Sequence, residues 1–227
     1  MIYITGDTHI PIDIEKLNTK NFPEQMNMTK DDCVIICGDF GGVWSGGKRD
    51  GHWIKWLDGK NFTTLFVDGN HENHPLLNGH YEVARRYGGK VHRVADSVYH
   101  LMRGEVYSIG GKTLFAMGGA ASHDKEYRVE GVSWWPEEMP SEEEYKNAED
   151  NLSRCGWTVD LIVSHCCPDS IQSKISDYYE HNRLTNFFEC VIKANCKYKA
   201  WFFGHYHEDL VVDERHVCLY NGIVEIE

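Results

Sequence analysis

The sequence predicts a mixed α/β fold, in which buried strands alternate with helices and with hairpins. Apolar runs typical of buried strands each end in a polar loop that contains glycine, and they occupy residues 1–5, 33–37, 63–67, 160–164 and 200–203. Residues 97–119 and 209–227 instead resemble hairpin-linked strands, the first with its turn at 110–111. The chain has 227 residues, 41% of them hydrophobic, which is enough for a substantial core, and we expect a single domain over residues 1–227.

Helical patterns lie between several of these strands, at residues 46–60, 141–156 and 184–195. The second pattern is the clearest, because Ser141 and Glu144 have the spacing of a capping box and Gly156 follows the last periodic residue. The ligand sites of such sheets lie beyond the carboxyl ends of the strands. The five polar loops fall at those ends.

Composition excludes several classes of protein. The net charge is −12, from 35 acidic and 23 basic residues, which disfavours a general nucleic-acid binder. No apolar stretch has the length of a membrane span, and the first residues lack the pattern of a signal peptide, so we expect a cytoplasmic protein without membrane association. Eight cysteines include an adjacent pair, Cys166 and Cys167, and no C-x-x-C pair, which indicates reduced thiols rather than disulfides or a cysteine-type zinc site.

The five loops are rich in residues that bind divalent cations. Taken singly, each could be an ordinary turn or a helix cap. Taken together they supply two aspartates, one asparagine and five histidines, namely Asp7, His9, Asp39, Asn70, His71, His165, His205 and His207. Oxygen and imidazole donors gathered at one sheet edge predict a metal centre.

The loops also form an ordered set of motifs. "GDTH" (6–9), "GDFGG" (38–42), "GNHE" (69–72), the histidine after "LIVS" and "GHYH" (204–207) resemble, in order and spacing, the calcineurin-like metallophosphoesterase superfamily. The resemblance spans residues 6–207. It implies a four-layer αββα sandwich of two mixed β-sheets flanked by helices, and a hydrolase that acts on phosphoric esters with two divalent ions.

The resemblance also implies a division of the ligands. It places the first ion on Asp7, His9, Asp39 and His207, and the second on Asp39, Asn70, His165 and His205. Asp39 then bridges the two ions, which activate a water as the nucleophile, and His71 acts on the leaving group as acid or as an orienting cation. The donor set suits Mn, Fe, Zn, Co or Ni, and we expect Mn to serve in vitro.

The motifs predict only the class of the substrate, which is a phosphomonoester or phosphodiester of a small molecule or a nucleotide. In the protein Ser/Thr phosphatase branch the second motif reads GD-x-x-DRG, whereas Gly42 and Val43 stand at the Asp and Arg positions here. That branch is therefore disfavoured, and the Gly41–Gly42 pair would admit a bulkier ester. A nuclease with a local basic strip and a non-catalytic scaffold are the alternatives, and the oligomeric state stays open.

Two further loops carry candidate phosphate-binding side chains. Arg49 lies in "WSGGKRD", and His123 and Arg128 lie in "GGAASHDKEYR". Each loop either binds the phosphate of the substrate or is a solvated surface loop. Trp44, Trp134 and Trp135 also lie in loops, where they either stack on a nucleobase or pack in the core; we favour packing.

Overall fold

The computed structural model describes residues 1–227 and contains two mixed β-sheets. The seven strands of the first sheet are, in spatial order, β13 (Ile223–Ile226), β1 (Ile2–Thr5), β2 (Cys33–Ile36), β3 (Thr63–Phe66), β6 (Val98–Leu101), β5 (Gly89–Ala95) and β4 (Glu82–Arg86). The six strands of the second are β11 (Leu210–Val211), β12 (His216–Cys218), β10 (Ala200–Phe203), β9 (Leu161–Ser164), β8 (Lys112–Met117) and β7 (Glu105–Ile109).

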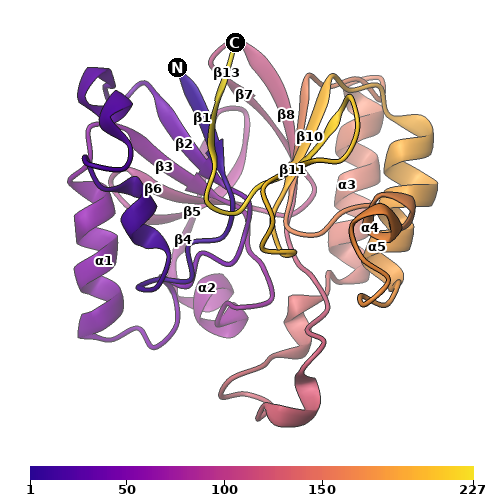
Figure 1. Cartoon of the computed structure of the whole chain (residues 1–227), viewed down its shortest axis with the longest axis horizontal. Coiled ribbons are helices and arrows are strands. Elements are labelled where there is room, and N and C mark those ends of the chain that lie inside the picture. Colours follow the sequence, from indigo (N-terminus) through magenta and orange to yellow (C-terminus); the bar gives the residue numbers. More distant parts are fainter.

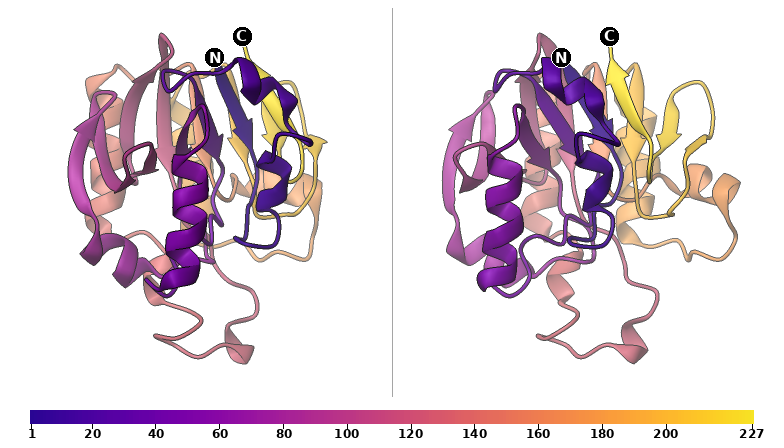
Figure 2. Two further views of the ribbon diagram at one scale, coloured as in Figure 1. Left: turned by 90° about the vertical axis from the view of Figure 1, so that its left-hand side faces the viewer. Right: turned by 60° about the vertical axis from the view of Figure 1, so that its left-hand side comes forward.

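Helices flank the two sheets (Figure 1). The α-helices are α1 (Lys48–Asp58), α2 (His74–His80), α3 (Glu142–Arg154), α4 (Asp169–Ile175) and α5 (Arg183–Phe187), and α5 continues into a π-helical turn at Phe188–Lys193. Short 3-10 turns occupy Ile14–Leu17, Pro23–Asn27, Lys125–Tyr127 and Pro136–Glu138. Helix α1 covers the outer face of the first sheet, whereas α3 and α5 cover the outer face of the second (Figures 1 and 2).

Three apolar clusters fill the spaces between four layers. The middle cluster joins the sheets, with Ile4 of β1 and Val163 of β9 among its members. The outer clusters join each sheet to its helices, and one of them contains Tyr3 of β1 together with Leu57 of α1. Because successive side chains of a strand point to opposite faces, a strand covered on both sides is apolar at every position. The predicted αββα sandwich of two mixed sheets is confirmed.

The predicted elements are found, with one change in how they are arranged. The five buried runs are strands, the three helical patterns are helical, and Ser141 and Glu144 form both hydrogen bonds of the capping box. Strands β7 and β8 pair as a hairpin around Gly110–Gly111, but β6 pairs with β3 and β5 in the other sheet, so residues 97–119 are not one set of hairpins. The tail divides in the same way, since β13 pairs with β1. Local alternation predicts strands, whereas long-range burial assigns them to a sheet.

The topology gathers the five polar loops at one edge. Strands β1, β2 and β3 are parallel neighbours in the first sheet, as are β9 and β10 in the second. Both termini lie at the opposite edge, and residues 120–140 extend beyond the edge that carries the loops (Figure 1). All eight cysteines are free and six of them are buried, as expected. No helix combines the length and the apolar character that crossing a lipid bilayer requires.

Candidate metal centre

The loops after the five buried strands bring the predicted metal ligands together. Three overlapping groups of donor atoms each lie within 4.8 Å of one another: Asp7, His9 and His207; His9, Asp39 and His71; and Asp7, Asp39 and His165. Asn70 joins them through its Oδ1, which is 3.2 Å from His165 Nε2. The ring of His205 packs on that of His165, with 4.9 Å between the centroids.

Asp39 lies at the middle of this cluster. Its Oδ2 is 3.2 Å from His9 Nε2 and its Oδ1 is 3.2 Å from His165 Nε2, so its two oxygens face two different histidines. Asp7 is also central, with its Oδ2 at 3.3 Å from His207 Nε2 and its Oδ1 at 3.7 Å from His165 Nδ1. Each of the two carboxylates therefore turns one oxygen toward each of two imidazoles.

Hydrogen bonds fix two of the imidazoles with Nε2 toward Asp39. The Nδ1 of His165 donates to the carbonyl oxygen of Cys37 at 2.8 Å, and a carbonyl can only accept, so this nitrogen carries the hydrogen. The Nδ1 of His9 is 2.8 Å from Asp13 Oδ2. Such partners behind the ring are typical of histidines that bind metals through the other nitrogen. Asp13 was not predicted, although its spacing of four residues from His9 is a local signal.

The two buried carboxylates of the cluster attract positive charge. Asp7 and Asp39 are 0% and 1% exposed, and neither has a lysine or arginine within ion-pair distance. Burial alone would lower the pKa values of His165 and His9. The Asp39 carboxylate outweighs burial at both, and raises the pKa of His165 to about 10 and that of His9 to about 9. Buried carboxylates require paired charges or metal ions. The donor set fits divalent cations, because its two buried carboxylates favour positive charge on the histidines around them.

Backbone strain concentrates on the same residues. His9, Asp39, His205 and His207 have φ values of 34°, 43°, 72° and 54°, in the left-handed region that residues other than glycine rarely adopt. Each such residue costs on the order of 1–3 kcal/mol and persists only where the surrounding structure holds it. Strain at four of the seven predicted ligands indicates that the loops are shaped by the centre rather than by local preference.

The glycines of the motifs allow the side chains to approach so closely. A Cβ on Gly69 would lie 2.1 Å from Asp39 Oδ1, and a Cβ on Gly204 would lie 2.0 Å from Asp7 Oδ1. Real Cβ atoms essentially never come so near another heavy atom. The carboxylates of the centre therefore occupy the space that these two positions leave free.

Comparison with protein families agrees with this geometry. The family model described as calcineurin-like phosphoesterase matches residues 1–209. The chain belongs to the calcineurin-like phosphoesterase family. A search of curated proteins found no match. Metal-dependent hydrolysis of phosphoric esters is accordingly the chemistry of this phosphoesterase, and the Asp and His groups described above can hold metal.

The candidate phosphate-binding residues of the phosphoesterase lie around the centre. Arg128 reaches His71, with Nη2 at 3.0 Å from its Nε2, while Arg128 Nε donates to Asp124 at 2.6 Å. Burial lowers the pKa of His71, and Arg128 lowers it further against the opposing effect of Asp39. A carboxylate beside His71 would favour its charged, acidic form; the structure instead places the Arg128 guanidinium there. Arg49 and His123 do not touch the centre and line two separate grooves beside it.

The second motif is closed where an open space was expected. Gly41 lines a groove next to His9, but a Cβ on it would lie 2.7 Å from the Ile10 amide nitrogen, and a Cβ on Gly42 would lie 2.5 Å from the ring of Phe40. The interpretation of the two glycines as open space was wrong, because backbone fills the side-chain position of the first and the Phe40 ring fills that of the second. Of the loop tryptophans, Trp135 is 7% exposed and packs as favoured, whereas Trp44 is half-buried at the groove.

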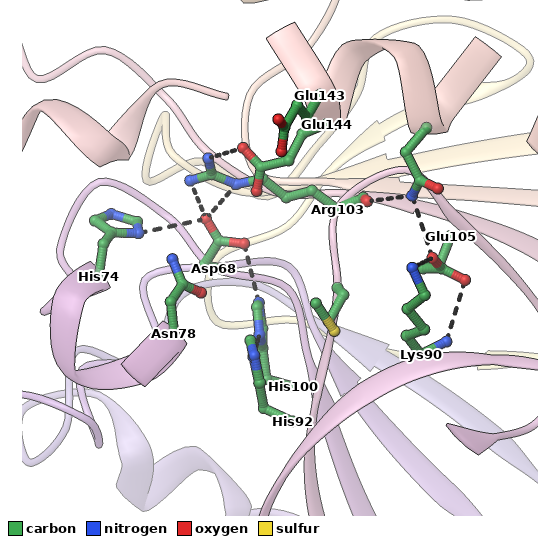
Figure 3. A pocket seen from close by; sticks show the side chains of 12 residues that line it. Asp68, His74, Asn78, Lys90, His92, His100, Arg103, Glu105, Glu143 and Glu144 are labelled. Atoms are coloured by element: carbon green, nitrogen blue, oxygen red, sulfur yellow. Dashed lines mark hydrogen bonds and ion pairs between the residues drawn. The ribbon is translucent and has the colours of Figure 1, made fainter. Parts of the chain in front are cut away.

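Buried carboxylates hold the GNHE segment from both sides, and their roles were not predicted. Glu72 Oε1 accepts from the amide of Phe40 at 2.6 Å, which ties this segment to the Asp39 loop. Asp68 accepts from Arg103 Nε at 2.9 Å and from His100 Nε2 at 3.0 Å. Figure 3 shows Asp68 between Arg103, His74 and the stacked pair His92 and His100. The side chains arrive from separate strands and helices, so no sequence motif marks the cluster.

The histidines of this cluster predict a pH dependence of stability. Burial and His100 lower the pKa of His92 to about 4, and burial and Arg103 lower that of His74 to about 3. Unfolded histidine has a pKa of about 6.5, so the unfolded chain binds protons first as the pH falls. The free energy of unfolding should therefore decrease from pH 6.5 towards pH 4, by up to about 1.4 kcal/mol per pH unit for each group. Urea unfolding of the metal-free protein at several pH values measures the slope. His92→Gln should make it shallower, and an unaltered slope would contradict the prediction.

Proposed function

We propose that this protein is a dinuclear metallophosphoesterase that hydrolyses a phosphomonoester or phosphodiester of a small molecule or nucleotide. The observation that carries the proposal is the position of Asp39, which turns one buried oxygen to His9 and the other to His165 without any lysine or arginine within ion-pair distance. Asp7, His9, Asp39 and His207 would hold one ion, and Asp39, Asn70, His165 and His205 the other.

Two divalent ions bound there would supply a nucleophile from water at neutral pH and would offset the charge of the phosphoryl group. The chain contributes the orientation. Asp13 and the Cys37 carbonyl keep the Nε2 atoms of His9 and His165 directed inward. Glu72 and the Gly69 backbone keep the loop of Asn70 and His71 against the loop of Asp39.

Arg128 and His71 are the proposed contacts to the reacting group. A guanidinium can donate two parallel hydrogen bonds to phosphoryl oxygens, and Arg128 already lies beside His71 at the rim of the centre. His71 would hydrogen-bond to the oxygen of the leaving group and orient it as the bond to phosphorus breaks. We propose Asp39 and His71 as the catalytic residues, with Arg49, His123 and Arg128 binding the substrate.

The alternatives gain no support from specific side chains. Val43 is fully buried, so its position offers no arginine-like clamp of the protein phosphatase kind. Arg86, one member of the basic strip that would favour a nuclease, stacks over the ring of Tyr99 at 4.6 Å. Its guanidinium is therefore engaged within the protein.

Removal and return of metal tests the proposal. Chelation should abolish hydrolysis of 4-nitrophenyl phosphate and bis(4-nitrophenyl) phosphate, and addition of Mn, Fe, Zn, Co or Ni should restore it at about two ions per chain. Elemental analysis gives the stoichiometry, and a panel of mononucleotides, cyclic nucleotides, dinucleoside polyphosphates, phosphopeptides and single-stranded DNA ranks the substrates. Hydrolysis that survives chelation, or a full complement of metal with no hydrolysis of any ester, would refute the proposal.

Removal of the proposed phosphate clamp should weaken catalysis without removing metal. Arg128→Ala should lower kcat/KM on 4-nitrophenyl phosphate by about 10- to 100-fold, because a hydrogen bond from a charged donor contributes about 1.5–3 kcal/mol. The half-exposed Arg93, paired with Asp96 on the surface, supplies the control Arg93→Ala. Unaltered kinetics of both Arg128→Ala and Arg49→Ala on every accepted substrate would rule out these loops as the clamp.

A further inference from the structure

A groove of about 300 Å³ opens beside the metal centre at His9 and His71. Its wall combines Ile12, which is 76% exposed, with the half-buried Trp44. The Trp44 indole is held edge-on by Trp135, with ring centroids 5.3 Å apart and planes at 84°. An exposed isoleucine and a braced indole next to a reacting centre form a flat apolar surface of the kind that binds planar rings.

The polar groups of this groove are mostly engaged. Asp50 Oδ2 accepts from the amides of Trp44, Ser45 and Gly46 at 2.9, 2.6 and 2.8 Å, so this carboxylate shapes the loop. Arg49 has no ion-pair partner and lies exposed on the lining. The groove therefore offers apolar walls and a single free cation.

A second groove, of about 530 Å³, opens at His205 and has a different character. Its lining includes Ser122, His123, Tyr178, Tyr179, His181 and His205. These hydroxyl and imidazole groups can hydrogen-bond to a polar substituent, whereas the first groove offers mainly apolar walls. The ring centroid of Tyr179 is 5.4 Å from that of His205, so the wall continues directly into the centre.

The two grooves are linked to different oxygens of Asp39. The oxygen Oδ2 faces His9, which lines the first groove, and Oδ1 faces His165, whose ring packs on His205 in the second. A phosphorus atom above Asp39 would thus have one groove toward each of these oxygens. His71, the proposed leaving-group residue, lines the first groove, which places the departing substituent there.

We propose that the groove of Ile12, Trp44 and Arg49 is a leaving-group site for a planar aromatic substituent, and that the groove at His205 holds the substituent retained on phosphorus. This inference rests on the proposed function. In the reaction the oxygen of water bonds to phosphorus, the P–O bond to the aromatic-bearing alcohol breaks, and that alcohol departs with a proton of the water. A phosphodiester then yields one alcohol and one phosphomonoester.

An asymmetric diester tests this arrangement. Benzyl 2-methoxyethyl phosphate carries one aromatic and one polar alcohol, both poor leaving groups, so the protein chooses which P–O bond breaks. The metal-loaded protein should release benzyl alcohol in about tenfold or greater excess over 2-methoxyethanol, a selectivity of the size that a shaped apolar pocket gives. Reaction in ¹⁸O-labelled water, followed by ³¹P NMR, establishes that the bond to phosphorus is the one that breaks.

Variants of the groove locate the selectivity. Ile12→Ser changes an exposed side chain and should therefore leave the fold intact, and Trp44→Ala removes the indole. Both variants should bring the ratio of benzyl alcohol to 2-methoxyethanol towards one. Val83→Ser, at a similarly exposed valine of β4, is the matched control and should keep the wild-type ratio. Binding of benzyl alcohol to the metal-free protein, followed by ligand-observed NMR, should weaken in Ile12→Ser and gives a readout independent of turnover.

The outcomes separate this inference from the proposed function. Equal products, or preferred release of 2-methoxyethanol, would overturn the assignment of the grooves and leave the phosphoesterase proposal intact. Hydrolysis of benzyl phosphate with no hydrolysis of the diester would do the same. No hydrolysis of either ester by metal-loaded protein that hydrolyses 4-nitrophenyl phosphate would overturn the assignment of the grooves, and no hydrolysis of the 4-nitrophenyl esters as well would overturn both.

Discussion

Replacement of Asp39 by asparagine is expected to reduce hydrolysis of 4-nitrophenyl phosphate by more than about 100-fold. The carboxylate faces His9 with one oxygen and His165 with the other, and an amide would lose both the charge and one of the two acceptors. The bound metal should fall below two ions per chain. Initial rates and elemental analysis of the same preparation measure both effects, and His165→Ala should have a comparable result.

A matched aspartate separates this effect from a general change in charge. Asp31 is exposed and far from the loops of the centre, so Asp31→Asn should keep wild-type rates and metal content. Circular dichroism establishes that Asp39→Asn is folded. If Asp39→Asn and His165→Ala both retained metal-dependent rates, Asp39 would not be the shared ligand and the centre would need a different arrangement.

Gly69→Ala should have the second large effect, although it adds only one methyl group. The new Cβ would lie 2.1 Å from Asp39 Oδ1 and 2.4 Å from the Asp39 amide nitrogen, and the backbone atom cannot move aside as a flexible side chain could. The two loops must separate, so we expect loss of at least one ion, loss of activity by more than about 100-fold, and destabilisation by about 1–3 kcal/mol from overpacking.

Gly51→Ala is the control for this variant. Gly51 lies in α1, where a Cβ meets no atom within 4 Å, so alanine should keep activity and increase the free energy of unfolding by about 0.5–1 kcal/mol. Metal titration and urea unfolding compare the two variants. Wild-type metal affinity in Gly69→Ala would mean that the close approach of Gly69 and Asp39 is not required.

The grouping of the donors could be predicted because it follows local rules. Buried strands appear as continuous apolar runs, and the loops that follow parallel strands meet at one edge, so Asp7, Asp39 and His165 were expected to lie together before any distance was known. The glycines before these residues were part of the motifs, but their steric reason was not visible. Gly69 is small because Asp39, thirty residues earlier, occupies the space beside it.

The supporting residues could not be predicted, because they come from unrelated segments. Arg103 ends up against Asp68, although 35 residues separate them, and the guanidinium of Arg128 reaches His71 across 57 residues. Neither pair has a spacing that a helix or strand would produce. The same holds for β6 and β7, which are close in the chain but lie in different sheets.

The sequence by itself therefore determined the α/β class, the buried strands and the set of candidate metal-binding side chains, since each depends on residue type and short-range spacing. Only the tertiary structure decided which loops contact one another and that a guanidinium rather than a carboxylate lies beside His71. It also decided that the centre opens into one apolar and one polar groove. Those features depend on the packing of distant segments, where the excluded volume of a single side chain such as Phe40 decides whether a glycine is open or filled. The opening motif "GDTH" joins a group of side chains that could hold a metal ion, because the fold returns His207 to Asp7 from the far end of the chain.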